Sequence, residues 1–291
     1  MHAADSIQAG KRSDAGTPPD PLAASGSPCR QPSPVAPVHC QWFDDTLTAL
    51  TSPTSVLRAT RRLAREADGL SWHTPSHVYN PLLYAWAGHR EYLQRYAGAR
   101  GRVLLLGMNP GPWGMTQTGV PFGDVVTVRE WFQIESKLGR PLPVQHPKYP
   151  ILGMACHRNE GSGSRLWRWA AERLGTPEDF FARFFVWNYC PLLFIGNNRN
   201  LIPEQLGRDE AAALGAVCDR ALRAVVRTLQ PSAIVGIGRY AERRATELFG
   251  VDAGIGYLPH PSPANPNSNK RWPELAEQAL ASWLPPRRAQ A

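Results

Sequence analysis

The sequence predicts a doubly wound α/β domain that extends from about residue 42 to residue 285. Four short apolar runs, at 103–106, 184–188, 233–237 and 255–258, are bounded by turn-forming residues. Continuous apolar runs of this length are typical of strands that are buried on both faces of a parallel sheet. Segments with helical spacing of apolar residues separate the four runs. This alternation of strands and helices predicts one parallel sheet that is covered by helices.

Before the first strand, the apolar spacing predicts two helices between 42 and 70, divided at Ser52-Pro53. A further helix is expected from Asn80-Pro81 to about Tyr96, with Leu83, Trp86 and Leu93 facing inward. After the first strand, helices are expected at 125–138, 166–174, 203–229, from Gly238 to Phe249 and at 272–283, with a short helix from Pro177. The stretch 139–159 is expected to be irregular.

The two ends of the chain have the composition of disordered tails. Residues 1–40 contain seven prolines among many serines, alanines and glycines. Such a segment buries too little apolar surface to offset the entropy lost on ordering. We therefore expect a disordered tail at 1–40, a folded domain at 41–285 and a short C-terminal tail at 286–291.

The composition favours an intracellular protein with a polyanionic partner. No apolar run approaches the roughly 18 to 20 residues of a membrane span, and the N-terminus lacks the apolar core of a secretory signal. We therefore expect no membrane partner, and a location in the cytoplasm of a bacterium or the nucleus of a eukaryote. The net charge is +8, and only four of the 32 basic residues are lysines. Arginine suits bidentate contacts to phosphate, so this excess of arginine over lysine favours a polyanionic partner. A solvated surface or a GC-rich coding bias would also give an excess of arginine.

The cysteines do not indicate a metal site. Five of them are scattered along the chain and no C-x-x-C pair occurs, so neither a structural zinc site nor an iron–sulfur cluster is indicated. Cys156 and His157 are adjacent, which is not a spacing for one metal ion. Unpaired thiols in a reducing compartment are expected.

The loop that follows the first strand is the strongest candidate for a binding site. Residues 107–123 contain five glycines and three prolines, together with Met108, Trp113, Met115, Val120 and Phe122. This loop is too apolar for a solvated tip, and glycine lets the backbone approach a flat ligand closely. In open α/β sheets, ligands bind beyond the carboxyl ends of the strands, where Met108, Asn109 and Gly111 would lie.

Three strands end in polar side chains that should meet at one edge of the sheet. Asn109, Asn188 and His260 each follow a predicted strand. No Gly-x-Ser-x-Gly elbow or P-loop is found, and Asp124 is the carboxylate we expect in the site loops, so acyl and phosphoryl transfer are poorly supported. Two amides, an imidazole and an apolar pocket suit a nucleobase that has left its duplex. Gly236-x-Gly238-x-x-Ala241 imitates part of a dinucleotide fingerprint without completing it.

The proline-rich loop after His260 is the candidate for DNA contact. Three prolines stiffen the segment from Pro261 to Pro266, and Lys270 and Arg271 follow closely. A rigid loop beside a pocket can enter a base stack while cations hold the phosphates. The candidate DNA-binding residues are Pro261, Ser262, Pro263, Ala264, Asn265, Lys270 and Arg271.

Three segments of the sequence resemble the signatures of the single-strand-selective monofunctional family within the uracil-DNA glycosylase superfamily. They are GMNPGPWGMTQTGVPFG at 107–123, NYCPL at 188–192 and HPSPANP at 260–266. The resemblance runs from about Tyr79 to Trp283. It implies a three-layer αβα sandwich around a parallel four-stranded sheet. It also implies hydrolysis of the N-glycosidic bond of uracil and 5-substituted uracils such as 5-hydroxymethyluracil in DNA, leaving an abasic site for base excision repair.

The resemblance also assigns roles to individual residues. It implies that Asn109 places the attacking water and that His260 stabilises the departing uracil anion, so these two are the candidate catalytic residues. By the same resemblance, Asn188 reads the uracil edge, Phe122 stacks on the base and Met108 contacts it through its backbone, while Gly111 and Met115 complete the substrate site. No metal or cofactor is implied. The enzyme is expected to act as a monomer on uracil-containing DNA, single-stranded and also double-stranded.

The chain departs from the family pattern after His260-Pro-Ser-Pro. Ala264 stands where arginine is familiar in vertebrate members, which bears on insertion of the loop into a duplex. Trp113 replaces phenylalanine, a swap of one aromatic ring for another. A different hypothesis is a DNA-lesion binding module that has lost turnover, and the presence of both Asn109 and His260 argues against it.

Overall fold

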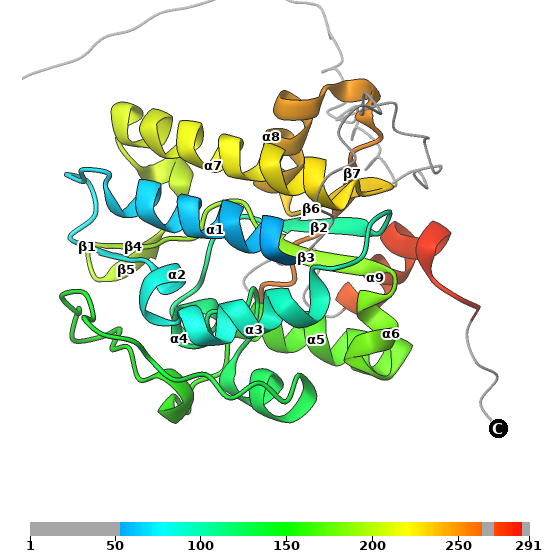
Figure 1. The fold of residues 1–291 in the computed structure, drawn as a ribbon, viewed down its shortest axis with the longest axis horizontal. Helices are drawn as coiled ribbons and strands as arrows, with labels where there is room; N and C mark the ends of the chain where they lie inside the picture. The colour runs from blue at the N-terminus through cyan, green and yellow to red at the C-terminus, as the bar shows by residue number, and fades with distance from the viewer. Residues whose placement is uncertain (1–52, 264–270, 287–291) are drawn as a thin grey trace, which may run out of the picture. The chain divides into compact units, whose positions relative to one another are not determined.

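The computed structural model describes residues 53–263 and 271–286 (Figure 1). The tail expected at 1–40, the helix expected before residue 53 and the last five residues of the chain lie outside this part. So do three candidate DNA-binding residues, Ala264, Asn265 and Lys270. No helix among the described residues is long and apolar enough to cross a membrane.

The four predicted strands form one parallel sheet. Its strands are β2 (Val103–Gly107), β3 (Phe184–Asn188), β6 (Ala233–Ile237) and β7 (Gly256–Leu258), in the order β3-β2-β6-β7. Each strand is parallel to its neighbour. Every residue of β2, β3 and β6 is buried, as their continuous apolar runs predicted. The register places Gly107 opposite Asn188.

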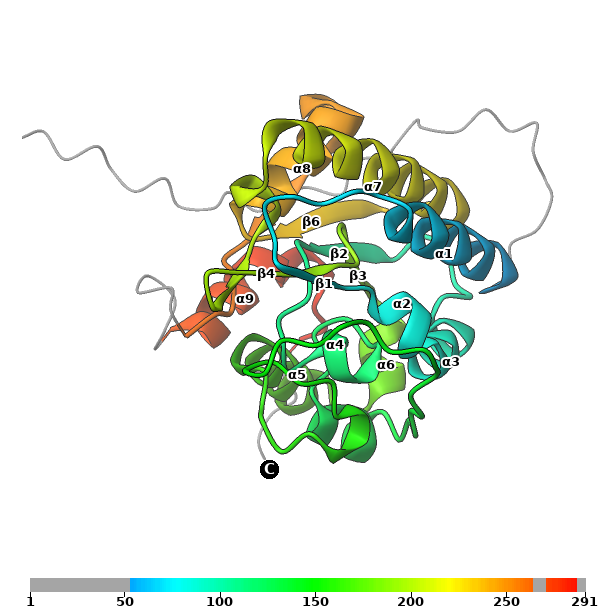
Figure 2. The ribbon, with the colours of Figure 1, turned by 90° about the vertical axis from the view of Figure 1, so that its left-hand side faces the viewer.

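Helices cover both faces of the sheet, which confirms the predicted three-layer αβα sandwich. α1 (Pro53–Asp68), α7 (Arg208–Leu229) and α8 (Arg239–Phe249) lie on one side (Figure 1). α3 (Trp86–Tyr96), α5 (Gly161–Leu174) and α6 (Pro177–Phe181) lie on the other, as the view in Figure 2 also shows. α9 (Trp272–Leu280) packs beside β7 and meets α5 through the rings of Trp272 and Trp169, 5.9 Å apart.

Two of the predicted helices are broken or shortened near their N-terminal ends. The helix expected at 81–96 is divided at Ala85 into α2 (Pro81–Tyr84) and α3, and Leu83, which was expected to face inward, is 42% exposed. The helix expected at 203–229 begins with a 3₁₀ turn at Pro203–Gln205, and α7 starts only at Arg208. Glu210 defines this start, because its carboxylate accepts a hydrogen bond from the backbone N–H of Gly207 at 2.9 Å.

The prediction of a helix at 125–138 is wrong. The chain forms one π-helical turn at Thr127–Trp131 and then continues without regular structure. Gln133 takes a left-handed backbone conformation (φ +53°), which ends the turn. Phe132 and Ile134 are nevertheless buried, so the apolar pattern identified the side chains that face the core but not the backbone that carries them.

A second, antiparallel sheet was not predicted. It consists of β1 (His77–Tyr79), β4 (Leu193–Gly196) and β5 (Arg199–Leu201) in the order β1-β4-β5. Asn197 and Asn198 both have positive φ and form the tight turn between β4 and β5. Two consecutive left-handed residues are the signature of a two-residue hairpin, so this asparagine pair was the available signal.

Several short elements complete the described chain. They are α4 (Met115–Thr118) and the 3₁₀ turns Gly153–Ala155, Val251–Ala253 and Ala281–Trp283. The three cysteines within the described residues, Cys156, Cys190 and Cys218, are buried free thiols, as expected from their spacing.

The packing of α8 on β6 depends on the absence of a side chain at Gly236. A Cβ at this position would lie 2.5 Å from Cα of Glu242 and 2.9 Å from the carbonyl carbon of Ala241. Both atoms belong to the backbone of α8, so the neighbour cannot yield by rotating a side chain. Glycine at 236 therefore sets the distance between the sheet and this helix.

We expect Gly236→Ala to lower the free energy of unfolding by about 2 kcal/mol, because overpacking a core costs that order of energy. Gly215→Ala in α7 is the matched control, since its Cβ would meet other atoms no closer than 3.8 Å. That control should raise the stability by up to about 1 kcal/mol through helix propensity. Urea denaturation followed by circular dichroism measures both. Equal stability of the two variants would contradict the steric argument.

Candidate functional site

A hollow of about 480 Å³ lies beyond the carboxyl ends of the parallel strands. All seven residues predicted for catalysis or substrate contact line it: Met108, Asn109, Gly111, Met115, Phe122, Asn188 and His260. The predicted convergence of the three polar residues is therefore confirmed. Asn109 follows β2, Asn188 ends β3 and His260 follows β7, and parallel strands end at the same edge of a sheet.

The floor of this pocket is built around Gly107, the last residue of β2. A Cβ here would lie 2.6 Å from Cε2 of Phe122 and still closer to Oδ1 of Asn188. The pairing of the two strands continues past the sheet, because the N–H of Tyr189 donates to the carbonyl of Gly107 at 2.9 Å and that of Cys190 to Met108 at 2.8 Å. Asn188 is thus held against β2 by backbone on both sides.

Asn188 presents a buried amide to the pocket. The residue is 5% exposed, and its Nδ2 lies 3.4 Å from the sulfur of Met115. Oδ1 is shielded from solvent and has no hydrogen-bond partner among the described residues. A buried acceptor without a partner costs free energy, so its presence in a pocket indicates a ligand that donates to it.

The amide of Asn109 is oriented by backbone carbonyls. Its Nδ2 donates to Leu192 at 3.2 Å and to Pro110 at 3.4 Å. With the amide nitrogen engaged in this way, Oδ1 is the atom that can accept from a water in the pocket.

Phe122 has a strained backbone that aims its ring at the pocket. Its φ is +56°, a left-handed value that is uncommon for an aromatic residue. The strain is maintained by packing against α5, where a Cβ at Gly163 would lie 2.9 Å from the carbonyl carbon of Phe122. The ring centroid lies 6.2 Å from that of His260. Strained residues of this kind gather at ligand sites.

His260 carries a neutral imidazole. Burial penalises the charged form and lowers the pKa of His260 from 6.5 to about 4. Its Nδ1 accepts a hydrogen bond from the backbone N–H of Ser262 at 3.1 Å, which leaves the ring proton on Nε2. The ring is therefore a neutral Nε2–H donor at physiological pH.

Glu160 is a pocket residue that the sequence reasoning missed, since Asp124 was the carboxylate expected there. Glu160 lines the pocket and packs behind Gly111, whose Cβ would lie 2.8 Å from the carboxyl carbon of Glu160. Burial raises the pKa of Glu160, and hydrogen bonds from the backbone of Trp113 and Gly114 oppose this rise. Its Oε2 has no partner among the described residues. Asp124 instead lines a neighbouring hollow.

The second sheet and the start of α5 also contribute to the wall. Asn200 on β5 and Ile202 just after it line the pocket, as does Ser162. Asn200 and Ile202 were not predicted, because the hairpin that carries Asn200 was not recognised, and Ser162 was not predicted either. The remaining lining residues are Pro110, Pro112, Trp113 and Ser262.

The described part of the loop after His260 lies beside the pocket. Ser262 lines it, Pro261 is buried, and Pro263 lines the neighbouring hollow. Arg271 is exposed just before α9 and is not among the residues that line either hollow. The described residues contain no group of three or more His, Cys, Asp or Glu side chains that could hold a metal ion.

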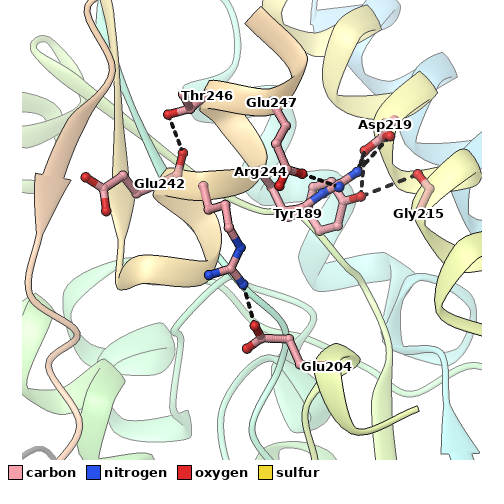
Figure 3. Close-up of polar contacts among 9 residues, drawn as sticks. Tyr189, Glu204, Gly215, Asp219, Glu242, Arg244, Thr246 and Glu247 are labelled. Atoms are coloured by element: carbon pink, nitrogen blue, oxygen red, sulfur yellow. Dashed lines mark hydrogen bonds and ion pairs between the residues drawn. The ribbon is translucent and has the colours of Figure 1, made fainter. Parts of the chain in front are cut away.

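A cluster of polar side chains behind the pocket anchors the end of β3 (Figure 3). The hydroxyl of Tyr189 donates to Asp219 at 2.6 Å, and Arg244 donates to both oxygens of Asp219 at 2.7 and 2.8 Å. Arg244 also pairs with Glu247 at 2.5 Å. The adjacent Arg243 on α8 pairs with Glu204, which follows the pocket residue Ile202. α8 thus ties two walls of the pocket together.

These features fit a flat polar heterocycle with hydrogen-bonding groups on its edges. Asn188 offers both a donor and an acceptor in a shielded position. Phe122 offers an aromatic face, and the neutral Nε2–H of His260 can stabilise negative charge that develops on a leaving group. Asn109 can hold a water in the pocket through Oδ1.

Comparison with known proteins gives a consistent result. The model of the uracil DNA glycosylase superfamily matches residues 94–283. The chain is 44% identical to a single-strand selective monofunctional uracil DNA glycosylase of Bos taurus over 207 residues, which cover 70% of this chain and 76% of that protein. It is 40% identical to the protein of the same name from Mus musculus over 263 residues, covering 86% and 92% of the two chains.

A solved structure shares the fold. The crystal structure of SMUG2 from Pedobacter heparinus aligns with a TM-score of 0.51 and 17% sequence identity, covering 77% of this chain and 96% of that one. The fold is therefore retained at a level of identity where little of the sequence is shared.

We expect the imidazole of His260 to titrate near pH 4 in the folded protein and to carry its proton on Nε2 above that pH. Because the folded pKa lies below the unfolded value of 6.5, the unfolded chain binds more protons between these values, and this histidine lowers stability as the pH falls through that window. Long-range ¹H–¹⁵N correlation spectra of the imidazoles measure both the pKa and the tautomer. A titration near 6.5, or a proton on Nδ1, would contradict the assignment.

Proposed function

The chain belongs to the uracil DNA glycosylase superfamily, and from this premise we propose how its pocket residues divide the reaction between them. The enzyme hydrolyses the N-glycosidic bond between uracil and deoxyribose in DNA. The bond between N1 of uracil and C1′ breaks, water adds its oxygen to C1′, and uracil leaves with the electron pair and takes up a proton. The products are free uracil and an abasic site in an uncut strand.

The observation that carries the proposal is the meeting of Asn109, Asn188 and His260 in one hollow, with His260 neutral. We propose that the Nε2–H of His260 donates to uracil O2 and stabilises the charge that builds up as the bond breaks. A fixed neutral donor of this kind acts without reorganisation at the moment of reaction. Protonation of His260 would turn Nδ1 into a donor and break its hydrogen bond from Ser262.

Asn109 is proposed to place the attacking water through Oδ1. An amide is a weak base, so this role suits a reaction in which the glycosidic bond is largely broken before water attacks. The sugar then carries cationic character, and the position of the water matters more than its basicity. The two backbone carbonyls that hold Nδ2 support this role because they fix the direction of Oδ1.

Asn188 is proposed to read the uracil edge. Its unpartnered Oδ1 would accept from N3–H, and Nδ2 would leave the sulfur of Met115 to donate to O4. Cytosine presents an amino group and a bare N3 at these positions and would leave the amide unpaired. Phe122 is proposed to stack on the ring, and Met108 to contact it through its backbone.

The proposal extends to 5-substituted uracils such as 5-hydroxymethyluracil. Gly111 has no side chain, which lets the carboxyl of Glu160 reach the pocket wall, and we propose that this carboxyl accepts a hydrogen bond from the hydroxyl of a 5-hydroxymethyl group. Single-stranded DNA is proposed as the preferred substrate, as the names of the relatives state for those proteins. The enzyme is proposed to act as a monomer. The proposed location is that of cellular DNA, the cytoplasm of a bacterium or the nucleus of a eukaryote.

Asn109→Ala and His260→Ala should each lower the single-turnover rate of uracil removal by about 10²- to 10³-fold, the usual value of a preorganised group. Affinity for uracil-containing DNA should change far less, because both residues act on the transition state. Alkali-induced cleavage of a uracil oligonucleotide measures the rate, and fluorescence anisotropy measures the affinity. A loss that is explained wholly by weaker DNA binding would contradict these roles, and a wild-type chain without turnover would indicate a lesion-binding module.

Asn188→Asp should depress uracil removal, because a carboxylate cannot donate to O4, and it should raise the ratio of cytosine to uracil excision. Single-turnover rates on paired oligonucleotides that differ only in this base measure the ratio. Affinity for DNA that contains an abasic site serves as the control, since no base occupies the pocket. Unchanged uracil kinetics in this variant would remove Asn188 from the reading edge.

A further inference from the structure

We propose that a second hollow, beside the catalytic pocket, binds the nucleotide that neighbours the excised uracil on the same DNA strand. The hollow has a volume of about 570 Å³ and lies between the start of α5 and the π-helical turn at Thr127–Trp131. This inference rests on the proposed function, uracil excision from DNA. It adds a contact between the protein and a second nucleotide of the same strand.

The two hollows are neighbours and share one wall. Along 159–162 the lining alternates, since Asn159 and Gly161 line the second hollow while Glu160 and Ser162 line the catalytic pocket. The loop after His260 does the same, with Ser262 on one side and Pro263 on the other. The wall is closed where Gly161 meets Pro263, because a Cβ at 161 would lie 2.9 Å from Cγ of Pro263. A strand with one base in the catalytic pocket would therefore reach the second hollow across this ridge.

One side of the second hollow is cationic. Arg165 and Arg168 both line it and are three residues apart on α5, so they project from the same face of the helix. Arg168 is exposed and forms no ion pair with any residue in the part of the chain that the structure describes. Guanidinium groups in this arrangement suit the phosphate of a nucleotide.

The opposite side is apolar and aromatic. Val126 is 46% exposed, and the half-buried ring of Trp131 lines the hollow. The indole is held in place, because its Nε1 donates to the carbonyl of Gly175 at 3.1 Å and the ring packs 5.7 Å from that of Trp167. A fixed aromatic ring opposite two arginines matches the two halves of a nucleotide, a base and a phosphate. Such contacts do not distinguish the four bases.

The hollow also contains two carboxylates, which differ in their state. Asp124 is buried and already engaged, since it accepts from the N–H of Thr127 at 2.9 Å and from the hydroxyl of Ser164. Glu130 is exposed at the rim, next to Trp131. The negative charge of Glu130 repels a phosphate. Removing this charge should therefore strengthen DNA binding, whereas removing the positive charge of Arg168 should weaken it. The proposal therefore predicts opposite changes in DNA affinity for substitutions at Glu130 and Arg168.

The test measures affinity for single-stranded DNA that contains one non-hydrolysable 2′-fluoro-deoxyuridine, by fluorescence anisotropy at several salt concentrations. Arg168→Gln should weaken binding by about fivefold and reduce the slope of log K against log salt by about 0.7, the value for one phosphate contact on a single strand. Glu130→Gln should strengthen binding. Arg227→Gln, at an exposed position of α7 on the other side of the sheet, is the matched control and should change neither quantity appreciably.

Truncated strands locate the contact. Oligonucleotides that end at the uracil on the 5′ side or on the 3′ side should differ, and the effect of Arg168→Gln should vanish for one of them alone. An equal loss with Arg227→Gln, persistence of the effect on both truncated strands, or no effect of Arg168→Gln would overturn the proposal. Uracil excision by the wild-type protein is measured in parallel, with uracil-containing strands at saturating concentration. Normal excision without an effect of Arg168→Gln would contradict only the proposed contact in the second hollow, whereas absence of excision would contradict the proposed function.

Discussion

The close approach of two strand ends, β2 at Gly107 and β3 at Asn188, is the constraint on which the site depends. Parallel pairing places these residues opposite each other, and the side chains of Asn188 and Phe122 occupy the space that a Cβ at 107 would take. The amide at the end of β3 and the aromatic ring that the loop after β2 carries thus meet at the same point. A site supported by the strands of a buried sheet holds its groups more firmly than one built on loops alone.

The pocket has two supports that belong to different layers of the sandwich. The end of β3 is fixed to α7 and α8 through Tyr189, Asp219 and Arg244. Phe122 and the wall at Glu160 are fixed to the start of α5, on the other side of the sheet (Figure 2). His260 packs against Gly238, the residue before α8, because a Cβ added at Gly238 would lie 3.4 Å from the Cβ of His260. The polar edge of the pocket is thus held by one layer and its aromatic wall by the other.

The buried sheet and the polar residues at its edge could be predicted from the sequence, because both depend on local patterns. Four uninterrupted apolar runs can satisfy their backbone and bury their side chains in few ways other than a parallel sheet. The parts that were missed depend on long-range contacts. Glu160 enters the pocket because glycines at 111 and 114 admit it, and nothing near Glu160 in the sequence shows this. The turn at 127–131 is held by Asp124 and ended by Gln133, so tertiary packing overrides its helical pattern.

The division of the pocket between two layers has a mechanical consequence. Packed helices can move by shear, in which they slide past one another by small amounts. Here a sliding motion of the α7–α8 layer relative to α5 would change the distance between the amide of Asn188 and the ring of Phe122. Substitutions far from the pocket, at the helix–sheet boundaries, would act on the site through this distance.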